Sequence, residues 1–133
     1  PYIIREASEE IGSQSIIVSI EAKRINDNKW EAYYDNGREK SGLDVLDWAV
    51  KAESLGAGEL LVTSVDKDGL RQGMDIELLK KIRKIISIPI IFGGGVGSIE
   101  HIKQALPDAD AVAIASTLHY GSLKIDEIKN DFN

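Results

Sequence analysis

Short apolar runs alternate along the chain with longer segments in which apolar residues recur every three or four positions. The runs are nearly continuous and rich in branched side chains, which is typical of strands buried on both faces. They are Ser15–Ile20, Leu60–Val65, Ile88–Phe92 and Ala109–Ala115. A helical pattern follows each run, and this order predicts parallel strands joined by right-handed crossovers.

Start and stop signals bound the helical segments. Gly56 is placed to end the first of them, Asp75 to cap the second, and Ser98 to begin the third. The apolar stripes that define the four helices are Val45, Trp48, Ala49, Ala52 and Leu55; Leu78, Leu79, Ile82, Ile85 and Ile86; Ile99, Ile102, Ala105 and Leu106; and Ile125, Ile128 and Phe132. Another helix, with Ile3, Ile4, Ala7 and Ile11 on one side, is expected at the beginning of the chain, with no strand before it.

Residues 25–40, between the first strand and its helix, are too many for an ordinary βα loop. Within residues 30–34 the side chains alternate in character, and Asp35-Asn36-Gly37 is a hairpin turn signal. We therefore expect a small β-hairpin that interrupts the βα order.

Four βα units make half of an eight-stranded (βα)8, or TIM, barrel, whose usual length is about 250 residues. The competing fold is an open, four-stranded, doubly wound sheet. Two features favour the half-barrel: the helix that precedes the first strand, and a weak repeat in which three identities share one offset, Ala57 with Ala109, Ser64 with Ser116, and Gly69 with Gly121. We expect residues 1–133 to form one half-barrel domain, whose outer strands have unpaired edges and which self-association completes.

The composition narrows the function. Asp and Glu number 22 against 16 Lys and Arg, and no basic run appears, which argues against a partner such as nucleic acid or a membrane surface. The chain has no cysteine, which excludes disulfides, thiolate nucleophiles and cysteine-based zinc sites. No apolar stretch approaches 18 residues, so we expect a cytoplasmic protein. The chain begins at Pro1 and is expected to be processed or cut from a longer protein.

The strongest candidate for chemistry is the glycine-rich stretch "FGGGVGS", which follows the third strand. Glycines without a Cβ let backbone N–H groups approach a phosphate, and Ser116 ends the neighbouring strand. The spacing is not that of a dinucleotide fingerprint, because Ser98 stands where that motif needs glycine. The alternative is a tight turn that needs glycine for its backbone angles.

Acidic residues supply further candidates. Glu21 follows an apolar strand and is suited to general acid–base catalysis, or it forms an ion pair with Lys23 or Arg24. Asp66 and Asp68 are placed to bind ribose hydroxyls or to cap a loop, and two carboxylates alone are a weak metal signal, so no metal is expected.

The two histidines are weaker candidates. His101 falls inside a predicted helix, where surface exposure or packing is the expected role. His119 follows the last strand and is a candidate substrate contact.

Taken together, four stretches resemble the cyclase subunits of imidazole glycerol phosphate synthase, a family of (βα)8 barrels in histidine biosynthesis. They are "GSQSIIVSIEAKR", "GAGELLVTSVDKDG", "IPIIFGGGVG" and "ADAVAIASTLH", and they match strands five to eight in family order. The resemblance implies a lyase or cyclase that needs no cofactor. It takes ammonia from a glutaminase partner and converts a phosphoribulosyl nucleotide to imidazole glycerol phosphate and aminoimidazole carboxamide ribotide.

The resemblance also implies roles for individual residues. Glu21 matches a catalytic aspartate, and Glu59 matches a carboxylate of the charged ring where ammonia enters. One substrate phosphate would be held at Asp68, Gly69, Gly94, Gly95, Ala115 and Ser116, and the substrate cleft would be lined by Thr63 and Ser64.

Two substitutions depart from the family pattern, and half of the barrel is missing. Glu21 is one methylene longer than the aspartate of the family, and Gly93 replaces a common serine. Strand one, with the second catalytic aspartate and the other phosphate site, is missing, so the isolated chain is expected to bind phosphate but not to turn over substrate. Two alternatives stay open: a paralogue that delivers ammonia for surface-sugar amidation, and a non-catalytic, self-associating half-barrel that binds phosphate.

Overall fold

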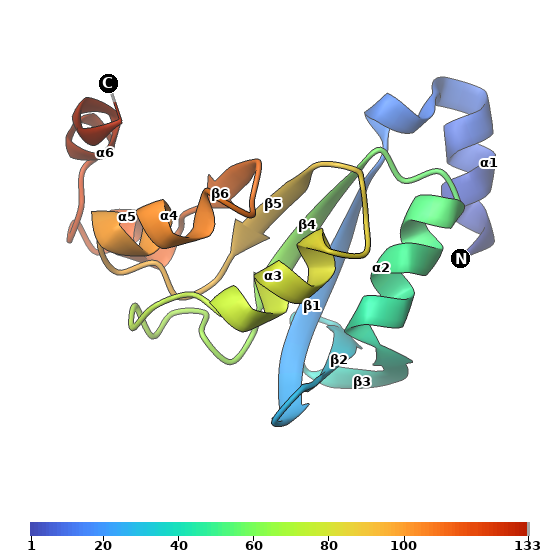
Figure 1. Cartoon of the computed structure of the whole chain (residues 1–133), viewed down its shortest axis with the longest axis horizontal. Coiled ribbons are helices and arrows are strands. Elements are labelled where there is room, and N and C mark those ends of the chain that lie inside the picture. Colours follow the sequence, from blue (N-terminus) through green and yellow to red (C-terminus); the bar gives the residue numbers. More distant parts are fainter. Residues whose placement is uncertain (133) are drawn as a thin grey trace.

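The computed structural model describes residues 1–132 as an open α/β fold built on one six-stranded sheet (Figure 1). The strands lie in the order β3-β2-β1-β4-β5-β6. Their bounds are β1 (Ile17–Asn26), β2 (Lys29–Tyr34), β3 (Glu39–Asp44), β4 (Glu59–Ser64), β5 (Ile90–Gly93) and β6 (Ala111–Ala113). Neighbours among β1, β4, β5 and β6 are parallel, whereas β2 and β3 pair antiparallel. The sheet does not close, and this mostly parallel architecture agrees with the predicted half of a TIM barrel.

The helices are α1 (Tyr2–Ile11), α2 (Val45–Ser54), α3 (Ile76–Arg83), α4 (Ile99–Ala105), α5 (Ser116–His119) and α6 (Ile125–Asp131), with a short 3-10 turn at Ser13–Ser15. The helices α2, α3 and α4 connect the parallel strands and pack buried residues against one side of the sheet, whereas α1 precedes β1 and α6 lies at the far end of the molecule (Figure 1). Asp75 caps α3 as predicted, because its carboxylate accepts the amide N–H of Leu78. No helix of the described part of the chain is both long and apolar enough to cross a membrane.

The two faces of the sheet differ in burial. Side chains alternate along each strand, and one set, including Ile20, Leu60 and Phe92, is fully buried beneath the helices. The other set faces away from them: Ile17 is 54% exposed, and Ala111 and Ala113 are also exposed. In a closed barrel this uncovered face would be the interior, and here nothing within residues 1–132 covers it fully.

Two strands differ from their predicted bounds. β1 begins after the predicted Ser15 and continues to Asn26, because its second half pairs with β2. Glu21 therefore lies within the strand and not beyond its end. β6 is only three residues long, because it has a single partner strand and the chain turns into α5, a helix the sequence pattern did not predict.

The hairpin also changes the expected edges of the sheet. β2 covers one edge of β1 from Glu21 to Asn26 and leaves Ile17–Ile20 unpaired on that side. The first strand therefore has an unpaired edge as expected, but the hairpin limits it to Ile17–Ile20, while the outer edge of β6 has no partner in the described chain.

Candidate functional site

One row of residues crosses the uncovered face near the carboxyl ends of the parallel strands. Glu21 of β1 stands opposite Thr63 of β4, Thr63 stands opposite Gly93 of β5, and Gly93 opposite Ala113 of β6. Because residues in one row share a face, the Glu21 carboxylate and the Thr63 hydroxyl lie on the same side of the sheet, and Gly93 continues their row without a side chain. Of the family-implied residues, Glu21 and Thr63 are thus brought together on neighbouring strands.

The hairpin turn holds the carboxylate of Glu21. Glu21 Oε2 accepts a hydrogen bond from the amide N–H of Gly37, the third residue of the predicted turn. Gly37 has φ 74°, and a Cβ there would lie 2.8 Å from Val65 Cγ1 beyond the end of β4. The turn therefore folds against both strands, and Glu21 does not need Lys23 or Arg24 as an ion-pair partner.

The loop after β5 depends on glycine at two consecutive positions. Gly94 and Gly95 have φ values of 93° and 92°, which favour glycine over other residues. A Cβ on Gly94 would lie 2.5 Å from the carbonyl oxygen of Ser64, and one on Gly95 would lie 2.2 Å from that of Gly73. The backbone of this loop thus passes very close to the β4–α3 loop, so the tight-turn explanation accounts for the glycines by itself.

Amide donors give this loop a second property. Within residues 1–132 the backbone N–H groups of Gly94, Gly95 and Ser116 donate no hydrogen bond to a protein acceptor. Gly94 and Gly95 are both buried residues, and buried amides are almost always paired. The loop after β5 and the start of α5 therefore present free donors at adjacent strand ends.

Direct contacts join the three loops around these donors. The amide of Gly73 donates to the carbonyl of Gly95 at 2.9 Å. The hydroxyl of Thr117, a fully buried residue, donates to the carbonyl of Val96 and so ties α5 to the loop after β5. Ser116 is the neighbour of Thr117 in α5, so its amide lies beside the same loop.

The remaining residues implied by the resemblance lie in three places. Asp68 and Gly69 are exposed in the β4–α3 loop, and the Asp68 amide already donates to the Ser64 carbonyl at 2.9 Å. The Ser64 side chain is fully buried, and its hydroxyl has no hydrogen-bond partner within the described residues. Ala115 directly precedes α5. Glu59 is at the opposite, amino end of β4, in register with Ile17 on the uncovered face.

Asp66 joins β1 to the β4–α3 loop. Its carboxylate accepts the backbone N–H of Arg24, which satisfies it within the protein. The Arg24 guanidinium bonds Asp75 at 3.0 Å and Glu77 at 2.9 Å. Burial acts to lower the pKa of Arg24, but the bonds to Glu77 and Asp75 outweigh it and raise that pKa. Asp75 also accepts the indole N–H of Trp30 at 2.8 Å, so this cluster is a structural connection between the hairpin and α3.

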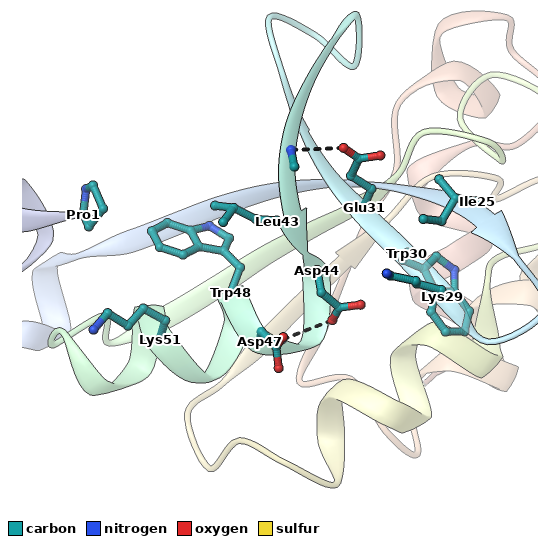
Figure 2. A pocket seen from close by; sticks show the side chains of 11 residues that line it. Pro1, Ile25, Lys29, Trp30, Glu31, Leu43, Asp44, Asp47, Trp48 and Lys51 are labelled. Atoms are coloured by element: carbon teal, nitrogen blue, oxygen red, sulfur yellow. Dashed lines mark hydrogen bonds between the residues drawn. The ribbon is translucent and has the colours of Figure 1, made fainter.

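A hollow lies elsewhere in the molecule, away from these residues. It measures about 800 Å³ and is formed by the first residue, the hairpin and α2. Figure 2 shows the Trp48 indole beside Leu43 in this hollow, with Lys51 and Pro1 farther along it. It contains none of the residues implied by the resemblance. A smaller hollow of about 400 Å³ lies beside Arg24, Asp66 and Lys67. Among residues 1–132, no three His, Asp or Glu side chains gather as metal ligands would.

Sequence patterns did not predict the side chains that bind the loop after β5. Thr117 and His101 both bind the backbone of the loop after β5: the His101 ring accepts the Gly97 amide at Nδ1, at 3.1 Å. Neither residue belongs to a short motif. The role of His101 could have been predicted from its position three residues after Ser98, the N-cap residue of the helix, because side chains at that position often reach back to cap a helix.

A comparison with protein families agrees with this architecture. The model of the family described as "Histidine biosynthesis protein" matches residues 1–124, which is nearly the whole chain. Members of this family are isomerases and cyclases of histidine biosynthesis, so an enzymatic origin for the fold is supported. The fold and the family match agree, and the chain belongs to the histidine biosynthesis protein family.

Proposed function

We propose that the chain is the carboxyl-terminal half-barrel of a cyclase-type subunit, and that by itself it binds a phosphate group at the ends of β5 and β6. The observation that carries the proposal is the set of free amide donors on Gly94, Gly95 and Ser116. A buried amide without a partner costs about 1–3 kcal/mol. Phosphate oxygens are strong acceptors that several converging amides can satisfy together.

Glu21 is the proposed acid–base group of the complete enzyme. It shares a row with Thr63 and Gly93 on the face that would line a barrel. A carboxylate at the carboxyl end of a barrel strand is where this fold carries catalysis. A phosphoribulosyl nucleotide anchored by its phosphate at Gly94 and Gly95 would extend across this face toward Glu21.

The missing half supplies the rest of the proposed reaction. It would contribute the second carboxylate of the acid–base pair and the site for the other phosphate. A glutaminase partner would deliver ammonia through the amino end of the barrel, past Glu59. Ring closure and cleavage would then give imidazole glycerol phosphate and aminoimidazole carboxamide ribotide.

One observation favours a second function, ammonia delivery for surface-sugar amidation. The Glu21 side chain is one methylene longer than that of an aspartate, and its carboxylate already accepts a hydrogen bond from the Gly37 amide. A side chain held this way is less free to move a proton to and from a substrate, and catalysis is sensitive to errors of about 1 Å. A barrel that mainly conducts ammonia would tolerate that arrangement.

The test uses a complete barrel that contains this half, supplied with ammonia and the phosphoribulosyl nucleotide. Cyclase function predicts formation of imidazole glycerol phosphate, and Glu21→Gln should abolish turnover with little change in substrate affinity. Turnover that survives Glu21→Gln would remove Glu21 from the mechanism, and no turnover by the parent would favour the amidation function. The isolated chain, titrated with inorganic phosphate in a calorimeter, should give heat of binding; absence of binding would contradict the phosphate site.

A further inference from the structure

His101 contacts two loops that meet beside the free amides. Its Nδ1 accepts the Gly97 amide at 3.1 Å. On the other side of the ring, a Cβ built on Gly73 would lie 3.7 Å from Nε2, which is ordinary contact distance. The ring therefore accepts a hydrogen bond from the loop Gly94–Gly97, here called the glycine loop, and faces the side of Gly73 where a Cβ would stand, in the segment Arg71–Gly73 that crosses this loop.

The contact replaces a conventional helix cap. Ser98 is the N-cap of α4, yet its side chain makes no capping hydrogen bond. The third residue of a helix often reaches back to a backbone amide at the helix start, usually as Glu or Gln. His101 is in that position and reaches one residue further, to Gly97. Since Nδ1 is the acceptor, the neutral ring carries its proton on Nε2.

The place where the ring acts is where the two loops are closest. A Cβ on Gly97 would lie only 1.9 Å from the Arg71 carbonyl oxygen, so the backbones cross with no space between them. Two residues earlier, the Gly95 carbonyl accepts the Gly73 amide at 2.9 Å. These contacts make the orientation of the Gly94 and Gly95 peptide units depend on where Gly97 is held.

We propose that His101 is a positioning residue of the phosphate site: by accepting the Gly97 amide it fixes the glycine loop so that the Gly94 and Gly95 amides face the ligand. The inference rests on the proposed phosphate binding and adds a residue outside the anion's own contacts. The proposed role depends on where the hydrogen-bond acceptor of residue 101 lies, so side chains of similar size should support phosphate binding to different extents.

The experiment compares three variants of the 133-residue chain with the parent. Asn places an oxygen close to the position of Nδ1, Gln places its oxygen farther out, and Leu has no acceptor. Backbone amide resonances of Gly94, Gly95 and Gly97 are recorded in ligand-free protein, and inorganic phosphate is then titrated in. Gln104→Leu is the matched control, because Gln104 is an exposed residue of the same helix and no hydrogen bond joins it to Gly97 within residues 1–132.

We expect His101→Leu and His101→Gln to weaken phosphate binding about three- to tenfold, the effect of losing one hydrogen bond. Both should shift the Gly94 and Gly95 resonances, whereas His101→Asn should restore both readouts. Gly94 and Gly95 resonances in His101→Leu that match those of the parent would overturn the proposal. It would also be overturned if His101→Leu were less stable than the parent but bound phosphate with the same affinity. If the parent binds no phosphate, the proposed function fails, and the resonances of the ligand-free variants still decide the role of His101.

Discussion

Replacing Gly95 by alanine tests whether the glycine loop is as tightly packed as the structure shows. The added Cβ would lie 2.2 Å from the Gly73 carbonyl oxygen and 2.9 Å from Lys67 Cβ, and the first of these is backbone that cannot rotate away. A φ of 92° adds about 1–2 kcal/mol of strain for a residue with a Cβ. Loss of the Gly73–Gly95 hydrogen bond adds about 1 kcal/mol. Overpacking adds about 1–3 kcal/mol, so Gly95→Ala should lower the free energy of unfolding by about 3–6 kcal/mol.

Gly121→Ala is the matched control. Gly121 also has a positive φ, 68°, but a Cβ there would meet nothing within 4 Å. It should therefore cost only about 1 kcal/mol, from backbone strain alone. Urea unfolding followed by the fluorescence of buried Trp30 measures both variants, and phosphate calorimetry on whatever remains folded should show weaker binding only for Gly95→Ala. Equal unfolding free energies for the two variants would refute the close approach of the loops.

Three further predictions concern stability and assembly. Asp75→Asn should destabilise the fold by about 2–3 kcal/mol in urea unfolding, because a buried carboxylate that accepts three donors is replaced by a weaker acceptor; an effect no larger than that of exposed Asp126→Asn would contradict this. The pKa of Glu53 lies below its usual 4.5, because the Ser87 hydroxyl and the amides of Ser87 and Ile88 outweigh burial. The hydrogen-bonded carboxylate therefore stabilises the fold above about pH 4.5, and this stabilisation is lost as the pH falls through the lowered folded pKa. Glu53→Gln should therefore flatten the fall in melting temperature on acidification below about pH 4.5, and an unchanged slope would be evidence against this. Light scattering should show a dimer or larger species, since the uncovered face exposes Ile17; a stable 14.6 kDa monomer at micromolar concentration would argue that the half-barrel is self-sufficient.

The elements that sequence predicted well are those with a strong local signal. The apolar runs gave the four parallel strands because each is buried by helices along one face. Asp75 correctly predicted the start of α3. The sequence Asp35-Asn36-Gly37 correctly predicted the β2–β3 turn, in which Asp35 and Asn36 have φ values of 53° and 55°. In each case a few consecutive residues carry the information.

The parts that sequence did not predict depend on partners distant in the chain. The polar residues Glu21, Lys23 and Arg24 extend β1 only because β2 supplies a second set of backbone partners. Arg24 and Asp66 are 42 residues apart, and the hydrogen bond between them cannot be read from either neighbourhood. The same holds for the candidate site. The glycine-rich stretch could be recognised in the sequence, but Thr117 and His101, whose side chains fix this loop, act through tertiary contacts.

The hairpin has a consequence for how a second half could join this one. Because β2 already occupies the edge of β1 from Glu21 onward, a strand that pairs with β1 on this side finds free donors and acceptors only along Ile17–Ile20. It cannot slide toward the carboxyl end without colliding with β2. A shift of one residue would also turn its apolar side chains to the wrong face. Open-edged sheets are prone to add strands in many alignments and grow into fibres, and the part of the edge that β2 covers limits the alignments available to a strand that joins β1.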